Sequence, residues 1–342
     1  MTAADLLVVG GGPVGLSAAI EARLAGLSVV LCEPRAGPVD KACGEGLMPG
    51  AVRLLSRLGV DPPGRDFTGI RYVDGGRTVE HRFRSGPGRG VRRTVLHEAL
   101  AARAAQMGVQ TVHARVGHVR QDLEGVSTAD GLRARWLFAC DGLHSSIRRQ
   151  LGLQRSSHRP ARYGLRRHFR VAPWSDSVEV HWTPEAEVYV TPVGDDLVGV
   201  AVLGRRDVDY ERVLDLASGV RERLEGAEAA SDLRGAGPMW QSTARRTAGR
   251  ILLVGDAGGY VDALTGEGIR LGLAQVRAAV AAVAAGRPGD YERAWRRQSR
   301  DYRLLTAALV TAAGRRRVRR RIVPLAERLP RVYGAIVERL AA

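Results

Sequence analysis

The sequence predicts an α/β fold in which a mostly parallel sheet is interrupted by an antiparallel β-sheet insertion and followed by C-terminal helices. The chain opens with a strand–helix–strand pattern, with a buried strand over 5–9, a helix over 14–25 and a strand over 27–32. Alternating apolar and polar residues between 162 and 203 are typical of a half-buried antiparallel sheet. Amphipathic helical patterns occupy the chain from residue 291 onward.

The remaining elements follow from the same apolar patterns. Helices are predicted over 49–58, 94–107 and 266–285, and glycines close the first two. Strands are predicted over 109–114, 135–139, 168–171, 178–182, 188–191, 197–203 and 251–254. In the insertion, Val178, Val180 and Trp182 share one face of a strand, and we expect His181 and Tyr189 on the opposite, polar face.

The composition is that of an ordinary globular protein. The 342 residues are 45% apolar and 26% charged, so the chain can bury a sizeable core without disulfides. There are three cysteines at no metal-like spacing, and no apolar run reaches the roughly 18–20 residues of a membrane span. We therefore expect a soluble, cytoplasmic protein without a metal site or a transmembrane segment.

The net charge of +16 is unusual, and half of it lies near the C-terminus. Residues 300–342 contain eleven arginines and three acidic residues, which leaves +8. A nucleic-acid reader would interleave aromatic residues with its basic ones, and this segment does not. A solvated helix face is the expected explanation, and peripheral contact with an anionic membrane surface is the alternative.

A glycine-rich turn joins the first strand to the first helix. Gly10-x-Gly12-x-x-Gly15 has the spacing at which a tight turn, a close approach to pyrophosphate and close helix–sheet packing each require glycine. Pro13 opens the helix, whose N-terminus favours an anion. Glu33 ends the second strand, where an acidic side chain can accept hydrogen bonds from a ribose. These residues predict a dinucleotide site on a Rossmann-like domain.

Three further segments resemble the flavoprotein monooxygenase and geranylgeranyl reductase superfamily, whose fold is that of para-hydroxybenzoate hydroxylase. They are Cys140-Asp141-Gly142, Gly255-Asp256-Ala257 with the turn Thr265-Gly266-Glu267-Gly268-Ile269, and Arg93-Thr94-Val95-Leu96. The resemblance implies FAD. The residues expected to contact it are Gly10, Gly12, Pro13, Gly15, Glu33, Arg35, Arg93, Asp141, Asp256, Gly266, Gly268 and Ile269. It also implies an FAD-binding domain over 1–70, 89–160 and 241–290, a β-rich substrate domain over 71–88 and 161–240, and C-terminal helices over 291–342.

The sequence lies between two branches of that superfamily. The resemblance favours a single-component NAD(P)H-dependent monooxygenase of secondary metabolism, acting through a flavin C4a-hydroperoxide on an apolar or phenolic molecule such as a polyketide or isoprenoid. The alternative is FAD-dependent reduction of C=C bonds, because Lys41-Ala42-Cys43-Gly44-Glu45-Gly46-Leu47 resembles a segment of geranylgeranyl reductases. No second dinucleotide motif is present, so NAD(P)H would bind transiently.

Catalytic residues are less clearly indicated than the cofactor site. The candidates are Cys43, His181 and Tyr189. A cysteine without a neighbouring base is usually inert, so packing beside the flavin is the preferred interpretation for Cys43. The Arg166-Arg167 and Arg205-Arg206 pairs are expected to be solvated.

Overall fold

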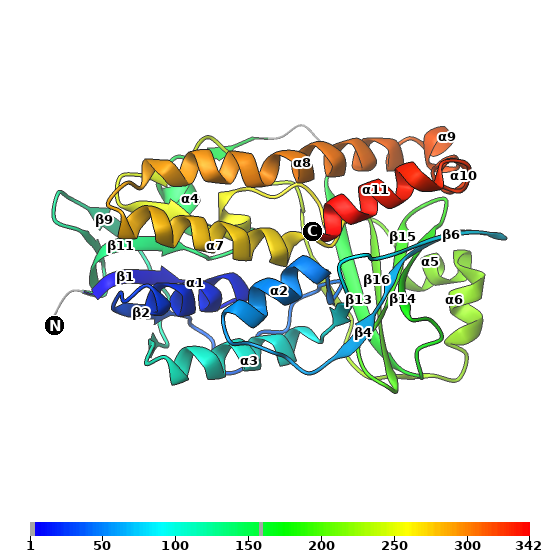
Figure 1. Ribbon diagram of the computed structural model, residues 1–342, viewed down its shortest axis with the longest axis horizontal. Helices are drawn as coiled ribbons and strands as arrows, with labels where there is room; N and C mark the ends of the chain where they lie inside the picture. The colour runs from blue at the N-terminus through cyan, green and yellow to red at the C-terminus, as the bar shows by residue number, and fades with distance from the viewer. Residues whose placement is uncertain (1–3, 157–159) are drawn as a thin grey trace.

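The computed structural model describes residues 4–156 and 160–342. The molecule is elongated, with a parallel sheet at the end that carries the N-terminus and an antiparallel sheet at the other end (Figure 1). The α/β class, the inserted sheet and the C-terminal helices are confirmed. The residue boundaries of the two domains stay a prediction.

The first sheet has the order β20-β21-β11-β1-β2-β8. Its parallel strands are β8 (Gln110–Val112), β2 (Val29–Cys32), β1 (Ala4–Val9), β11 (Arg133–Ala139) and β21 (Ile251–Leu253), and β20 (Thr247–Ala248) pairs antiparallel at one edge. The hairpin of β9 (Val119–Gln121) and β10 (Val126–Thr128) extends β11.

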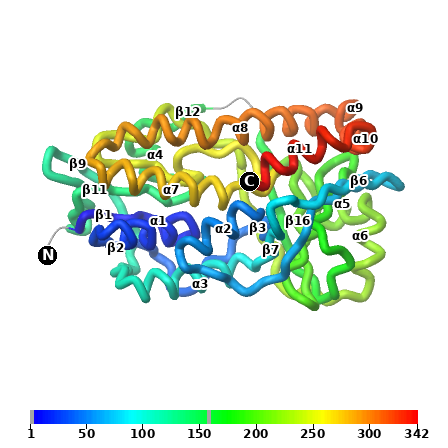
Figure 2. Tube along the Cα trace, in the orientation of Figure 1, coloured from blue at the N-terminus to red at the C-terminus, as the bar shows by residue number. Residues whose placement is uncertain are grey.

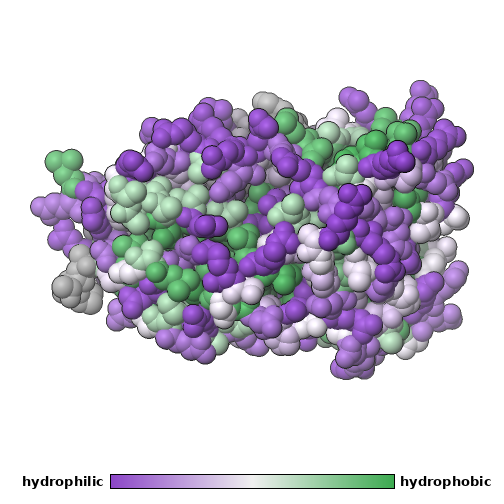
Figure 3. Space-filling view, in the orientation of Figure 1, coloured by the Kyte–Doolittle hydropathy of each residue, from purple (hydrophilic) through white to green (hydrophobic). Residues whose placement is uncertain are grey.

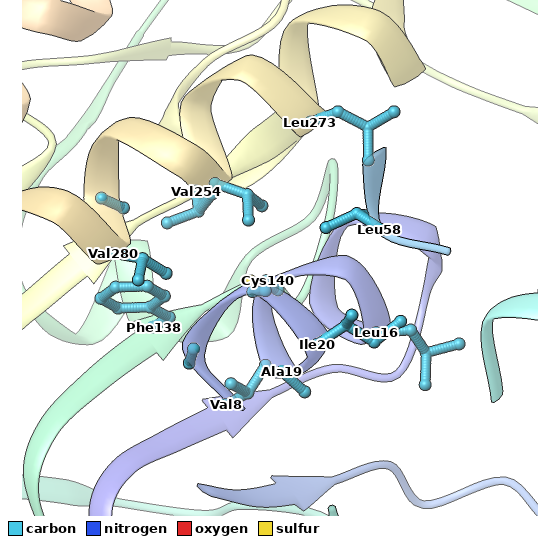
Figure 4. Packing of buried hydrophobic residues seen from close by; sticks show 14 of the residues in the cluster. Val8, Leu16, Ala19, Ile20, Leu58, Phe138, Cys140, Val254, Leu273 and Val280 are labelled. Carbon is cyan, nitrogen blue, oxygen red and sulfur yellow. The ribbon is translucent and has the colours of Figure 1, made fainter. Parts of the chain in front are cut away.

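Helices cover this sheet because its strands are apolar on both faces. One face packs on α1 (Pro13–Leu24), α2 (Pro49–Arg57), α3 (Arg93–Gln106) and α7 (Gly268–Ala284). Figure 4 shows Val8 and Phe138 of the sheet meeting Ile20 of α1 and Val280 of α7. The 3-10 helix η1 (Gly255–Gly258) and the short α4 (Ser146–Gln150) follow β21 and β11.

The second sheet has the order β17-β13-β16-β15-β14-β5-β6. Four expected strands are present as β13 (Arg162–Arg170), β14 (Ser177–Trp182), β15 (Glu187–Pro192) and β16 (Leu197–Arg205). The hairpin of β5 (Gly69–Asp74) and β6 (Arg77–Arg82) was not expected as strands, and β5 pairs parallel to β14. This pair is the one parallel pairing among the described strands of an otherwise antiparallel sheet, and β5 and β6 fall almost wholly within the 71–88 segment predicted to be β-rich.

Short strands complete the two halves. They are β3 (Gly46–Leu47), β4 (Arg65–Phe67) and β7 (Gly88–Gly90) in one small sheet, β12 (Gln154–Arg155) with β19 (Ser242–Thr243), and β17 (Glu228–Ala229) and β18 (Arg234–Ala236) beside β13. One face of the large antiparallel sheet is closed by α5 (Tyr210–Leu216) and α6 (Ser218–Arg223).

The C-terminal helices connect the two halves. Helix α8 (Gly289–Ala313) runs beside α7 along the first half and reaches the second, where α9 (Arg316–Arg319), α10 (Ile322–Arg328) and α11 (Pro330–Ala341) follow (Figures 1 and 2). Side chains of α10 and α11 join the core on the other face of the antiparallel sheet, including Val323, Tyr333 and Val337. Within 4–156 and 160–342, no helix combines the length and apolar character needed to cross a membrane.

Candidate functional site

A cavity of about 320 Å³ lies between the two halves of the molecule, within the size range of small-molecule sites. Eleven of the twelve residues expected to contact the cofactor line this cavity: Gly10, Gly12, Pro13, Glu33, Arg35, Arg93, Asp141, Asp256, Gly266, Gly268 and Ile269. Segments that are far apart in the sequence therefore meet at one site. Gly15 is the exception, and it packs behind the cavity wall.

The glycine turn has the geometry that its spacing predicts. Gly10 has a φ of 104°, and a Cβ there would lie 2.5 Å from the carbonyl oxygen of Cys140. A Cβ at Gly15 would collide with the carbonyl of Gly10, so the first turn of α1 can lie directly against β1 only without a side chain. A Cβ at Gly12 would meet only the Arg93 guanidinium, at 3.9 Å. The backbone at Gly12 is therefore open to a ligand.

Glu33 is held in place at the end of β2. Its carboxylate accepts hydrogen bonds from the Gly11 amide at 2.8 Å and from Arg35 Nε at 2.6 Å. Burial alone would raise the pKa of Glu33, but these hydrogen bonds hold it below its ordinary value. Glu33 is therefore an ionised acceptor beside the cavity at neutral pH.

Three cations surround the middle of the cavity. Arg35, Lys41 and Arg93 all line it. Burial, together with the charges of Arg35 and Arg93, lowers the pKa of Lys41. Like charges placed this closely favour a bound anion that neutralises them, as a pyrophosphate would. Lys41 is not among the cofactor contacts predicted from the sequence, although it belongs to the Lys41–Leu47 segment that resembles geranylgeranyl reductases.

Asp256 presents a carboxylate to the cavity at the start of η1. Burial raises the pKa of Asp256, while the charges of Arg93, Lys41 and Arg148 oppose that rise. In the described part of the chain, nothing donates a hydrogen bond to this carboxylate. A desolvated acceptor of this kind fits a ligand that carries hydroxyl groups.

Asp141 lies nearby, in the turn that precedes α4. Its Oδ2 accepts a hydrogen bond from the Ser146 amide at 2.8 Å, while its Oδ1 is buried without a partner among the described residues. Arg148 is 1% exposed, and its guanidinium donates to the carbonyl oxygens of Leu143 and Ala257. Arg148 thereby ties the Asp141 turn to η1, so the two motifs form one wall.

The turn that precedes α7 carries two buried acids. Burial raises the pKa of Asp262 to about 6, opposed by Arg162, and that of Glu267 to about 7, opposed by Arg270. Gly266 has a φ of 69° and lines the cavity together with Gly268, where the helix begins. The open backbone of this turn is suited to contact a flat ring.

Beyond the cofactor motifs, the cavity continues as an apolar chamber. The chamber wall comes from the antiparallel sheet, from the turn before α7 and from α11. It is made by Phe67, Ile70, Tyr72, Val178, Val180, Tyr189, Leu203, Met239, Leu264, Val337 and Leu340. Cys43 lines the same cavity, in the segment that precedes β3.

The structure corrects the expected faces of the sheet. Tyr189 pairs directly with Val180, so it lies on the apolar face with Val178 and Val180, and its hydroxyl donates to the Leu264 carbonyl at 3.0 Å. His181 is on the other face, where its Nε2 lies 2.9 Å from Glu179, and it does not line the cavity. Trp182 packs on Tyr72 behind the chamber wall and does not line the cavity either.

A second correction concerns Arg166, which is 1% exposed and not solvated. It forms an ion pair with Asp40 and lies 3.2 Å from His168 Nδ1. The other ring nitrogen of His168 is 2.6 Å from Glu45 Oε2, and both side chains are 1% exposed. Periodicity alone could not find this cluster, because its members come from β13 and from a loop more than a hundred residues earlier.

Glu45 also connects the Lys41–Leu47 segment to the cofactor side of the cavity. Its Oε1 accepts a hydrogen bond from the Arg93 amide at 2.8 Å. Glu45 has a φ of 58°, a conformation that a non-glycine residue rarely adopts. The buried contacts with His168 and Arg93 compensate this strain and hold Cys43 and Gly44 beside the cavity.

Comparison with known families decides which dinucleotide the motifs serve. The family described as FAD binding domain matches residues 3–294. The chain belongs to this family. It is an FAD-dependent oxidoreductase, and the glycine turn, the three cations and the unpartnered Asp256 carboxylate fit FAD. Among the described residues, no group of three or more His, Cys, Asp or Glu side chains could hold a metal ion.

Curated relatives of this flavoprotein fall into two groups. Menaquinone reductase of Mycolicibacterium smegmatis is 32% identical over 329 residues, covering 86% of this chain and 80% of the relative. Digeranylgeranylglycerophospholipid reductase 2 of Methanosphaera stadtmanae is 28% identical over 326 residues, covering 86% and 81%. Rifampicin monooxygenase of Streptomyces venezuelae is 27% identical over 303 residues, covering 79% and 61%.

Solved structures share the fold of this flavoprotein. The flavin-dependent brominase Bmp2 matches with a TM-score of 0.83 and 19% identity, covering 99% of this chain and 94% of that one. The p-nitrophenol 4-monooxygenase of Pseudomonas putida matches with a TM-score of 0.81 and 18% identity, covering 99% and 98%. At these identities the likeness concerns the fold alone.

Proposed function

We propose that this flavoprotein adds two hydrogens across a C=C bond of an isoprenoid lipid, with NAD(P)H as the source of electrons. The observation that carries the proposal is the chamber, whose wall is mostly aliphatic and aromatic, with the hydroxyls of Tyr72 and Tyr189 as its polar groups among the wall residues named above. Such a wall stabilises an apolar chain by excluding water. The names of the first two relatives, a menaquinone reductase and a digeranylgeranylglycerophospholipid reductase, support the same class of substrate.

The residues proposed to hold FAD are those of the cofactor side of the cavity. Glu33 would accept hydrogen bonds from the adenosine ribose, and the Gly10–Gly15 turn with Arg35, Lys41 and Arg93 would hold the pyrophosphate. Asp256 would accept hydrogen bonds from the ribityl chain. The turn of Gly266 and Gly268 would support the ring at the entrance of the chamber.

Bound FAD, once reduced, would supply the hydride for one carbon of the double bond. The other carbon would take a proton, so that one equivalent of NAD(P)H and one proton would be consumed for each bond saturated. Cys43 and the hydroxyls of Tyr72 and Tyr260 are among the proton-bearing side chains that line the cavity. Burial raises the pKa of Tyr72, so this phenol stays protonated at neutral pH. The Tyr189 hydroxyl is already engaged with Leu264.

Monooxygenation of an apolar molecule is the second candidate. A chamber that excludes water also protects an oxygen-activating flavin, and the relationship to rifampicin monooxygenase supports this candidate. Hydroxylation of a phenol is less favoured, because activating a phenol requires a base. His181, the histidine expected to serve, lies outside the cavity.

The two candidates differ in what reoxidises the flavin. Holoenzyme reduced with dithionite under anaerobic conditions is mixed with menaquinone or a digeranylgeranyl lipid in detergent micelles, and flavin absorbance is followed by stopped flow. The proposal predicts reoxidation by the lipid without oxygen. Reduced flavin that is stable until oxygen is admitted, together with an oxygenated product, would instead establish the monooxygenase.

A chamber variant shows whether reoxidation takes place at the described site. Val180→Phe fills the chamber, and Val73→Phe is its matched control, since Val73 neighbours Tyr72 on β5 and does not line the cavity. We expect Val180→Phe to slow reoxidation by the lipid at least roughly tenfold, because the added ring occupies substrate volume. Val73→Phe is expected to leave the rate unchanged.

A further inference from the structure

The outer surface of the C-terminal helices carries apolar side chains that folding leaves exposed. Val318 of α9, Leu325 of α10, Leu329 at the junction and Val332 of α11 are 38%, 48%, 52% and 54% exposed. Leu325, Leu329 and Val332 lie around the junction of α10 and α11. Leu329 has a φ of −123° and a ψ of 58°, outside the helical region, so α10 and α11 are separate helices and these apolar side chains lie at and on either side of their junction.

The inner surface of the same helices is also apolar. Val323, Tyr333 and Val337 are at most 6% exposed and pack against the antiparallel sheet. Burial on that side already accounts for the docking of α10 and α11 onto the protein. The outer apolar residues are not needed for this docking, and their exposed surface is available to a partner.

Arginines surround this outer surface. Exposed arginines from α9, α10 and their flanks are Arg315–Arg317, Arg320, Arg321, Arg328 and Arg331. Throughout the described ranges, none of these seven is within ion-pair distance of an acidic side chain, and the neighbouring Glu327 is paired with Arg77. Figure 3 shows hydrophobic side chains beside hydrophilic ones over this end of the molecule.

We propose that α9, α10 and α11 form a docking surface for an anionic lipid bilayer. The apolar side chains insert among the headgroups and acyl chains, and the seven arginines bind lipid phosphates. A nucleic acid would match the charge but would leave the four aliphatic side chains exposed to water. An acidic protein would need a surface of complementary shape, whereas a fluid bilayer can adapt to an apolar and basic surface of any shape.

The position of the surface relative to the cavity is consistent with this role. Helix α11 carries Val332 on its exposed side and contributes Val337 and Leu340 to the chamber wall. One helix therefore separates the proposed bilayer contact from the chamber. Docking does not depend on the reaction proposed above, so it is tested without substrate.

Vesicle sedimentation tests the docking surface directly. Holoenzyme is sedimented with vesicles of phosphatidylcholine alone and with vesicles that also contain phosphatidylglycerol, at low and high salt. We expect binding only to the anionic vesicles, weakened by salt. Arg316→Glu/Arg317→Glu/Arg320→Glu is expected to reduce binding roughly 100-fold, and Leu329→Glu/Val332→Glu at least roughly tenfold.

Matched controls come from the opposite end of the molecule. Leu123, in the β9–β10 turn, is 93% exposed, and Arg115 and Arg120 are exposed residues near it. Leu123→Glu and Arg115→Glu/Arg120→Glu are expected to bind vesicles like the wild type, and FAD content verifies folding in every variant. Failure to bind anionic vesicles, or equal loss in the control variants, would overturn the proposal. Duplex DNA that competes with vesicles and binds the uncharged variant Leu329→Gln/Val332→Gln as tightly as the wild type, while this variant keeps full vesicle binding, would overturn it in favour of a nucleic-acid surface.

Discussion

Replacing Asp256 with asparagine separates the role of this carboxylate in binding from its effect on the fold. The carboxylate lines the cavity without a hydrogen-bond donor among the described residues, and burial raises its pKa. In the apoprotein the negative charge of Asp256 therefore lowers the free energy of unfolding, and asparagine removes this destabilising charge with little change in side-chain shape. With FAD bound, the same charge strengthens hydrogen bonds from the ribityl hydroxyls.

The expected loss of affinity follows from the energy of such bonds. Hydrogen bonds to a charged group contribute about 1.5–3 kcal/mol and neutral ones about 0.5–1.5 kcal/mol, so Asp256→Asn, which keeps a neutral acceptor, should weaken FAD binding about 5- to 13-fold. Titration of the apoprotein with FAD, followed by flavin fluorescence, measures this change. Asp207→Asn is the control, because Asp207 is 79% exposed in a surface turn.

Thermal unfolding of the Asp256→Asn apoprotein provides the second readout. We expect its melting temperature to equal or exceed that of the wild-type apoprotein, since a partly desolvated carboxylate without a hydrogen-bond donor among the described residues has been removed. The reasoning is refuted by an FAD affinity within twofold of the wild type. A markedly less stable apoprotein would equally show that Asp256 is a structural residue.

Four further substitutions test other parts of the site. In the folded protein the pKa of Glu267 is raised to about 7, so its protonation stabilises the fold fully below its ordinary pKa of 4.5, and this stability is lost as the pH rises to about 7. Glu267→Gln should therefore shrink the difference in unfolding free energy between acidic and alkaline buffer by a few kcal/mol. An unchanged pH profile of the unfolding free energy would contradict the raised pKa of Glu267. His168→Ala removes the hydrogen-bond partner of Glu45 Oε2 and should lower the free energy of unfolding by about 1–3 kcal/mol in denaturant titrations. No measurable loss would show that water replaces the histidine. Cys43→Ser should keep most turnover if the thiol only packs in the segment; loss of several orders of magnitude with FAD content unchanged would make Cys43 the proton donor. Tyr189→Phe removes one neutral hydrogen bond, to the Leu264 carbonyl, so lipid-dependent turnover should fall at most about tenfold with FAD binding unaffected, and a larger loss would give the hydroxyl a chemical role.

The cofactor side of the site could be predicted because its signals are local. Gly10, Gly15 and Glu33 belong to one strand–helix–strand unit, and each residue type follows from a geometric requirement within that unit. Asp141 and Asp256 stand directly after strands of the same parallel sheet, so their side chains meet at its carboxyl edge. Sequence spacing is sufficient for contacts of this kind.

The substrate side depends on pairing between distant strands. Tyr189 was expected on the face of His181, because a single-strand pattern does not determine the register between β14 and β15. The observed register places Tyr189 opposite Val180, which moves its side chain to the chamber. Likewise, the burial of Arg166 depends on Asp40, which lies 126 residues away in sequence and compensates its charge.

The most direct test of the proposed reaction is the mass of the lipid after a single anaerobic turnover of the reduced holoenzyme, measured after the product has been returned to air. Saturation of a C=C bond predicts a gain of two hydrogens that survives exposure to air, whereas a quinol formed at a quinone ring would be reoxidised to the starting mass. A lipid of unchanged mass, or one that has gained an oxygen atom only when O₂ is present during turnover, would contradict the proposed reduction.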